Sequence, residues 1–104
     1  MLSEQTKTEI RKRLLEKFEL KKIILFGSQA RGTADDKSDV DLLVITSNLR
    51  DRLELMQLMR EVLLPMDYAF DVIAVTSEEF DRDRFIPGTV SRYASLEGVV
   101  IYDS

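Results

Sequence analysis

Two short stretches, Gly27-Ser28-Gln29-Ala30-Arg31-Gly32 and Ser38-Asp39-Val40-Asp41-Leu42-Leu43-Val44, decide how this sequence folds and what it can do. The first follows an apolar run that ends at Phe26, and the second opens another apolar run with two aspartates separated by one residue. A glycine-serine turn leading into a helix is typical of a phosphate site, and paired carboxylates are typical of a divalent-metal site. Together the two stretches indicate an enzyme that handles a nucleoside triphosphate.

The composition narrows the class of protein. The chain has 104 residues, so we expect a single domain over residues 1–104. Its net charge of −4 argues against a protein that mainly binds nucleic acid through the phosphates. Cysteine and histidine are both absent, so acid–base or metal chemistry has to use carboxylates, hydroxyls or lysine. No apolar run could span a bilayer and no signal peptide is recognisable, so we expect a soluble cytoplasmic protein without a membrane partner.

Helix and strand patterns alternate along the chain, which predicts an α/β (α+β) fold with helices packed on a small mixed sheet. The strands are predicted at Lys22–Phe26, Val40–Thr46, Tyr68–Val75 and, peripherally, Val99–Tyr102. The helices are predicted at residues 3–19 with Ser3 as N-cap, near Gln29–Arg31, at Leu49–Leu64, after Ser77 as N-cap, and from Pro87 to about Leu96; Thr33–Ser38 is predicted as a polar loop. The continuous apolar run Leu42–Ile45 indicates a central strand covered on both faces.

The phosphate half of the pattern rests on Gly27, Ser28 and Arg31. Glycine permits a sharp turn and close approach of another group to the backbone. A helix that begins at Ser28 points backbone N–H groups and the positive end of its dipole outward, and the serine hydroxyl adds a donor. Arg31, one helical turn later, could reach the same phosphates or pair with a nearby aspartate. The competing interpretation is an ordinary strand-to-helix turn with Arg31 as a surface charge.

The metal half begins with Asp39 and Asp41, which lie two residues apart in a strand pattern and so share one face. Their carboxylates repel each other unless a cation lies between them, and Mg²⁺ prefers oxygen ligands that it shares with substrate phosphates. The alternative is an aspartate pair in a solvated turn.

Asp71 favours the metal interpretation because it interrupts an otherwise apolar strand, where a carboxylate is costly unless it is paired, bound to metal or at an open strand end. If that strand lies beside Val40–Thr46, three carboxylates gather, and two Mg²⁺ ions about 3.5–4 Å apart could bind there. Asp71 would then accept the proton of an attacking hydroxyl or hold the hydroxyl as an alkoxide on the metal. Asp67 is a weaker candidate for this role because it precedes the strand.

These residues resemble a known family. Gly27-Ser28, ten intervening residues, Asp39-Val40-Asp41 and then Asp71 in the next strand are similar to the nucleotidyltransferase superfamily that includes DNA polymerase beta. The fuller motif, together with the closing Glu97-Gly98-Val99-Val100-Ile101-Tyr102, looks like the minimal nucleotidyltransferase (MNT) proteins. The resemblance extends over nearly the whole chain and implies the polymerase beta-like palm fold.

The resemblance also implies an activity. A hydroxyl attacks the α-phosphorus of a nucleoside triphosphate and pyrophosphate leaves. Gly27 and Ser28 would bind the triphosphate, Asp39 and Asp41 would hold metal, and Asp71 would complete the site. Many MNT proteins are antitoxins paired with a HEPN-domain toxin, and some transfer AMP from ATP to a toxin tyrosine, as in type VII-like toxin–antitoxin pairs. The alternative is a non-catalytic antitoxin that neutralises its toxin by direct binding. A bare catalytic domain fits a protein acceptor better than a polynucleotide.

The predicted helix Leu49–Leu64 is apolar around more of its circumference than one core contact requires. Leu49, Leu53, Met56 and Leu63 form one stripe, and Leu55, Leu58, Met59 and Val62 widen it. One interpretation is that the second stripe binds a partner or another copy, giving a homo-oligomer through helix 49–64. The other is that the C-terminal segment covers it.

Ligand binding should stabilise a site made of mutually repelling carboxylates. We predict that Mg²⁺ with ATP raises the melting temperature of the protein, because the cation and the triphosphate bind the folded state alone. Differential scanning fluorimetry with and without millimolar Mg²⁺–ATP measures the shift. An unchanged melting temperature would count against a working site.

Overall fold

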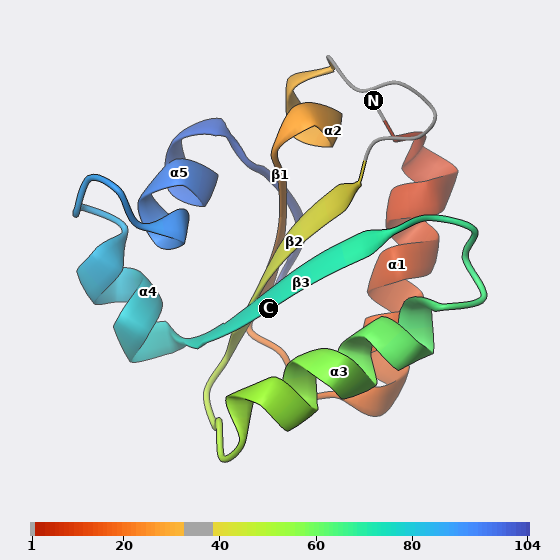
Figure 1. Cartoon of the computed structure of the whole chain (residues 1–104), viewed down its shortest axis with the longest axis horizontal. Coiled ribbons are helices and arrows are strands. Elements are labelled where there is room, and N and C mark those ends of the chain that lie inside the picture. The colour runs from red at the N-terminus through yellow and green to blue at the C-terminus, as the bar shows by residue number, and fades with distance from the viewer. Residues whose placement is uncertain (1, 33–38) are drawn as a thin grey trace.

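The computed structural model describes residues 2–32 and 39–104, and these form a four-stranded mixed sheet with helices on both faces (Figure 1). The strand order is β3-β2-β1-β4; β1 pairs antiparallel with β2 and β4, and β2 pairs parallel with β3. The strands are β1 (Lys22–Phe26), β2 (Val40–Thr46), β3 (Phe70–Thr76) and β4 (Val99–Asp103). The predicted α/β mixed sheet is therefore confirmed, with β4 at its edge. The loop predicted at Thr33–Ser38 lies outside the described residues.

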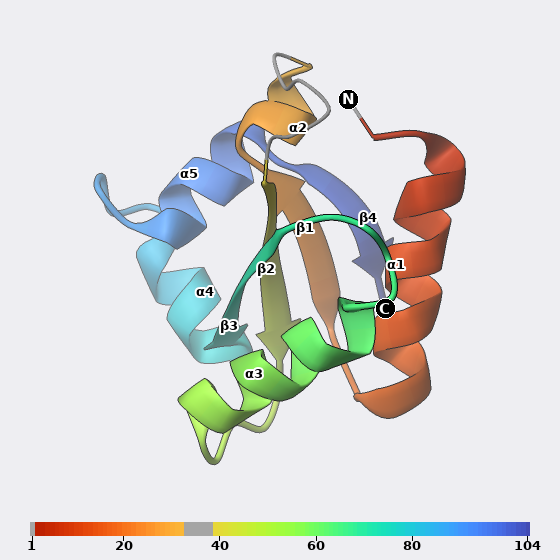
Figure 2. The ribbon, with the colours of Figure 1, turned by 45° about the vertical axis from the view of Figure 1, so that its right-hand side comes forward.

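Two layers of helices enclose the sheet. Figures 1 and 2 show α1 and α3 on one side of it and α4 and α5 on the other. The helices are α1 (Glu4–Lys17), α2 (Ser28–Arg31), α3 (Arg52–Leu63), α4 (Ser77–Asp83) and α5 (Val90–Glu97). Within the described part of the chain, none of them is long and apolar enough to cross a membrane.

Strand β2 is the centre of the core because both of its faces are covered. Val40, Leu42 and Val44 belong to the cluster that includes Met59 and Leu63 of α3 and Ile10 and Leu14 of α1, whereas Leu43 and Ile45 pack with Phe80 of α4 and Ala94 of α5. Each fully buried aliphatic side chain contributes about 1.5–3 kcal/mol relative to exposure, so this strand is strongly fixed in place. The prediction of a central strand covered on both faces is confirmed.

The first predicted helix ends too late and the third begins too early. Helix α1 stops at Lys17 rather than at residue 19, because Phe18 is extended (φ −134°) while its N–H still bonds to Leu14. Helix α3 covers Arg52–Leu63 rather than Leu49–Leu64, because the Asp51 side chain accepts the N–H of Glu54 and caps the helix there. Ser3 caps α1 as predicted.

In the C-terminal half, the predicted starts of two helices and one strand also differ from the structure. Thr76, not Ser77, caps α4, because Thr76 and Glu79 exchange side chain–backbone hydrogen bonds in a capping box. Helix α5 starts after Thr89 rather than at Pro87, because the Thr89 hydroxyl accepts the N–H of Arg92. Strand β3 starts at Phe70 rather than at Tyr68, since its ladder with β2 begins at the Val40–Phe70 pair.

The wide apolar stripe of α3 is only partly used. Met59 and Leu63 are buried, whereas Leu53 is 73% and Leu58 is 42% exposed. Helix α3 packs on β3 and α1, and the C-terminal helices lie on the opposite side of the sheet (Figure 2). The interpretation that the C-terminal segment covers the second stripe is therefore wrong, and a homo-oligomer through this helix stays a prediction.

Candidate active site

The turn after β1 has the conformation that the sequence predicts. Gly27 has φ +75°, a region open to glycine and strained for other residues, and α2 begins directly after it at Ser28. The N–H groups of Ala30 and Arg31 both donate to the Gly27 carbonyl at 3.1 Å, and a left-handed Gly32 (φ +74°) ends the helix. A sharp turn thus places the start of α2 at the end of the sheet.

The absence of a side chain at Gly27 makes room for Asp41. A Cβ atom built on Gly27 would lie 2.2 Å from Oδ2 of Asp41. The contact follows from sheet pairing, because the preceding residue, Phe26, is the register partner of Asp41 across β1 and β2. The glycine-serine turn and the aspartate pair of the sequence pattern therefore meet at one end of the sheet.

Three carboxylates lie at the same end of the sheet. Asp71 of β3 is the direct register partner of the half-buried Asp41, and Asp39 lies exposed just before β2. Burial and the negative charges of Asp71 and Asp39 raise the pKa of Asp41, while the nearby Arg31 guanidinium lowers it. The predicted neighbourhood of β2 and β3 is confirmed. Asp67, the weaker candidate, is exposed in the turn before β3.

The site fits a hard cation that is completed by its substrate. Among residues 2–32 and 39–104, no three acidic side chains converge closely enough to enclose an ion by themselves. Mg²⁺ in nucleotide sites is usually held by one or two carboxylates, with substrate phosphates and water supplying the remaining oxygens. Asp39 and Asp41 beside the Gly27 turn provide such a donor set. The number of ions stays a prediction.

Arg31 connects the turn to α5. Its guanidinium donates a hydrogen bond to the Tyr93 hydroxyl, lies 6.0 Å from the centre of that ring, and approaches Oε2 of Glu97 at 3.6 Å. The Tyr93 ring in turn meets Phe26 edge to face at 6.0 Å between centroids. Arg31 is therefore placed by α5 while its charge still acts on Asp41.

Sequence reasoning missed Tyr93 and Glu97. They lie four residues apart in α5 and so share one helix face, which is a signal visible in the sequence. That signal does not reveal the partner, because Arg31 is 62 residues away from Tyr93 along the chain.

Fold and site define a small α/β domain in which a glycine-serine turn and three carboxylates lie at one end of the sheet. The family model described as "Nucleotidyltransferase domain" matches residues 7–96, and the chain belongs to this family. The family resemblance stated from the sequence is therefore confirmed, and the chain is assigned to a class of enzymes rather than of binding modules.

Two relatives from Methanocaldococcus jannaschii support the assignment. "Putative protein adenylyltransferase MJ0604" is 34% identical over 83 residues, which are 80% of this chain and 79% of that protein. "Putative protein adenylyltransferase MJ1305" is 49% identical over 51 residues, but these span 48% of this chain and only 35% of that protein.

Solved structures share the fold. A toxin–antitoxin structure with AMP-PNP aligns with a TM-score of 0.64 at 22% identity and covers 94% of this chain and 73% of that one. A tri-AMPylated Shewanella oneidensis HEPN toxin in complex with its MNT antitoxin aligns with a TM-score of 0.64 at 20% identity, covering 98% and 74%. At these identities the likeness establishes the fold alone.

Gly27→Ala tests the close approach to Asp41, and Gly32→Ala tests alanine at another positive-φ glycine that makes no such approach. Both glycines have φ near +75°, but a Cβ at Gly32 meets nothing within 4 Å. Alanine at Gly32 (ψ +17°, left-handed) costs about 1–2 kcal/mol, whereas Gly27 (ψ −156°) lies in a backbone region that is essentially restricted to glycine, and only Gly27→Ala also displaces the carboxylate. We expect Gly27→Ala to abolish Mg²⁺–ATP binding measured by calorimetry and Gly32→Ala to retain it. Equal losses of Mg²⁺–ATP affinity in the two variants would contradict a nucleotide site that depends on the close approach of Asp41 to Gly27.

The raised pKa of Asp41 predicts a pH-dependent gain in stability on its neutralisation. A carboxyl whose pKa is higher in the folded state destabilises the fold once ionised, and this penalty disappears as the pH falls below the ordinary aspartate pKa of about 3.9. We expect metal-free Asp41→Asn to melt at a higher temperature than the wild type at pH 7, with the difference shrinking toward pH 3. Asp81→Asn, on the exposed face of α4, is the control and should melt like the wild type.

Proposed function

We propose that this protein is a Mg²⁺-dependent nucleotidyltransferase that transfers AMP from ATP to a protein hydroxyl, a tyrosine of a HEPN-domain partner. The observation that carries the proposal is the Asp41 carboxylate packed against the Gly27 turn, which supports a metal site and a phosphate site side by side. Family membership, relatives named as protein adenylyltransferases and the AMPylated HEPN toxin of a structural neighbour support the finer assignment.

Different residues at this end of the sheet bind the triphosphate and the metal. The Gly27–Ser28 turn receives the triphosphate, and Arg31 stands one helical turn further on to contact it. Asp39 and Asp41 hold the metal, with Asp71 completing the set opposite Asp41. When bound, Mg²⁺ supplies positive charge that offsets both the carboxylates and the triphosphate.

Transfer requires a deprotonated acceptor oxygen. Asp71 is exposed at the start of β3 and accessible to an incoming side chain, so it accepts the proton of the acceptor hydroxyl. The hydroxyl oxygen then forms a bond to the α-phosphorus as the bond from that phosphorus to the α–β bridging oxygen breaks. The electron pair of that bond leaves with pyrophosphate, and AMP remains on the acceptor.

ATP labelled at the α- or the γ-phosphate distinguishes transfer of AMP from transfer of the γ-phosphate. The purified protein is incubated with Mg²⁺, a HEPN-domain protein from the same genome, and ATP carrying ³²P at either the α- or the γ-phosphate. We expect α-label on the HEPN protein and γ-label only in released pyrophosphate. Peptide mass spectrometry then identifies the modified residue.

Variants decide whether catalysis underlies neutralisation of the partner. The double variant Asp39→Asn with Asp41→Asn should lose label transfer, and Asp81→Asn, distant in sequence from the site, should retain it. Full neutralisation of the HEPN protein by the double variant would instead establish a non-catalytic antitoxin that acts by binding.

A further inference from the structure

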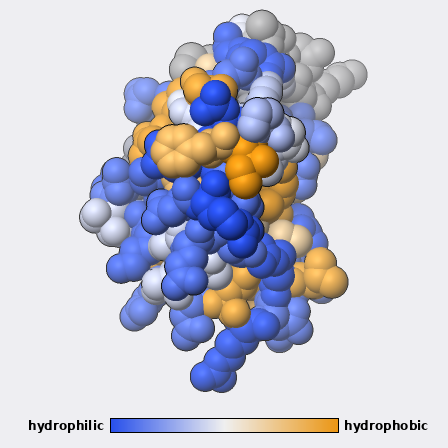
Figure 3. All heavy atoms as spheres, turned by 90° about the vertical axis from the view of Figure 1, so that its left-hand side faces the viewer, coloured by the Kyte–Doolittle hydropathy of each residue, from blue (hydrophilic) through white to orange (hydrophobic). Residues whose placement is uncertain are grey.

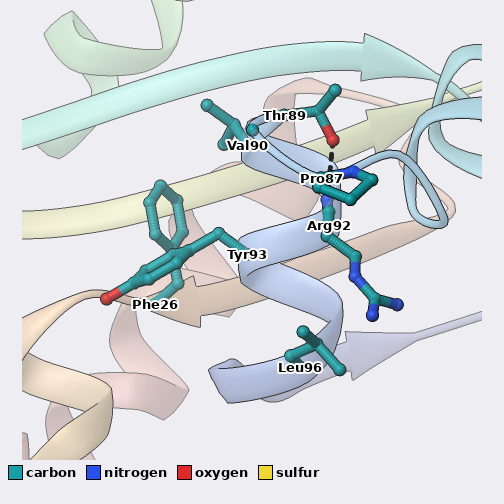
Figure 4. A pocket seen from close by; sticks show the side chains of 8 residues that line it. Phe26, Pro87, Thr89, Val90, Arg92, Tyr93 and Leu96 are labelled. Atoms are coloured by element: carbon teal, nitrogen blue, oxygen red, sulfur yellow. Dashed lines mark hydrogen bonds between the residues drawn. The ribbon is translucent and has the colours of Figure 1, made fainter.

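A hollow of about 470 Å³ lies beside the candidate active site, between the end of β1 and α5 (Figure 4). Its volume falls in the range of small-molecule sites, and its lining is mainly apolar and aromatic, as in most such sites. The residues that line it are Phe26, Pro87, Gly88, Thr89, Val90, Arg92, Tyr93 and Leu96.

Several apolar side chains of the lining are open to solvent. Leu96 is 64% exposed, and Val90 and Tyr93 are each 38% exposed. Figure 3, which views the molecule from the side of α4 and α5, shows apolar side chains gathered within an otherwise hydrophilic face. Apolar groups clustered around a concave surface mark a binding site more often than scattered ones do.

The hollow is adjacent to the predicted phosphate site through Phe26. Phe26, which forms one wall, directly precedes Gly27, and consecutive Cα atoms are only about 3.8 Å apart. Tyr93, another wall, accepts a hydrogen bond from Arg31 of α2. Its ring meets the ring of Phe26 edge to face, and Figure 4 shows the two side chains together. A ligand whose phosphates lie on this turn therefore has an apolar, aromatic surface within reach of its other end.

We propose that this hollow binds the base of the nucleotide. The inference rests on the proposed function, because it takes the triphosphate to lie at the Gly27–Ser28 turn. A purine ring is flat, largely apolar and able to pack against Tyr93 and the aliphatic walls Val90 and Leu96. The hollow therefore selects for the nucleoside part of ATP, whereas the turn and the carboxylates recognise the triphosphate and its metal.

Inorganic tripolyphosphate separates base recognition from phosphate recognition, since it carries the phosphates without the base. Isothermal calorimetry with Mg²⁺ compares ATP and tripolyphosphate binding to the wild type and to the double variant Val90→Ala with Leu96→Ala. We expect the double variant to weaken ATP binding about tenfold and to change tripolyphosphate binding less than twofold, because the truncated side chains contact only the base.

Two control variants sharpen the comparison. Leu53→Ala with Leu64→Ala truncates two equally apolar side chains of the α3 region, 73% and 72% exposed, and should leave both ligands unaffected. Tyr93→Phe keeps the ring but loses the hydrogen bond from Arg31, so it should preserve the ratio of the two affinities.

Three results would overturn the inference. The first is an equal loss of ATP and tripolyphosphate affinity in the double variant. The second is unchanged ATP affinity combined with lost transfer to the HEPN protein, which would assign the hollow to the acceptor while leaving the proposed function intact. The third is failure of the wild type to bind either ligand, which would reject the proposed function as well.

Discussion

The contact between Asp41 and Gly27 is the constraint on which the site depends. A carboxylate at the start of β2 occupies the volume that any side chain at position 27 would need. This arrangement holds only if β1 and β2 keep the register that pairs Phe26 with Asp41. A slip of one residue would turn Asp41 to the other face of the sheet, and the core residues of β2 with it. Burial of both faces of β2 therefore fixes the position of the site.

That same strand carries an unfavourable electrostatic arrangement at its end. Asp41 is half-buried and faces the charges of Asp71 and Asp39, and the result is a raised pKa. Such local costs are typical of functional sites, where the surrounding structure stabilises a geometry that the isolated groups would avoid. Here the apolar run from Leu42 to Ile45 supplies that stability, since all four side chains are buried.

Local patterns in the sequence predicted the strands around the site better than the helix ends. The bounds of β1 and β2 match the prediction because apolar runs and the adjoining Gly27 mark them unambiguously. Helix starts were misplaced where several capping residues compete, as Thr76 and Ser77 do, and only the contact with Glu79 decides between them. Asp71 is a predicted site residue because an acidic residue within an apolar strand pattern is visible from the sequence alone.

The contribution of α5 could not be predicted in this way, because it depends on contacts across the fold. Tyr93 and Glu97 share a helix face, but nothing in their spacing indicates that this face meets Arg31. The aromatic pair of Phe26 and Tyr93 also depends on contacts across the fold, since the two rings come together only when α5 packs on the sheet. Propensity and periodicity describe each element, whereas the choice of neighbours is set by topology.

The strength of the Arg31 contacts bears on its predicted role at the phosphates. Its side chain is 42% exposed and that of Glu97 is 45% exposed, and ion pairs of this kind contribute only about 0–1 kcal/mol. Phosphate oxygens offer an arginine stronger, charge-assisted hydrogen bonds. Glu97 and Tyr93 therefore place the guanidinium near Asp41 without holding it there firmly. The predicted contact of Arg31 with an arriving triphosphate requires a guanidinium that can leave these weak partners.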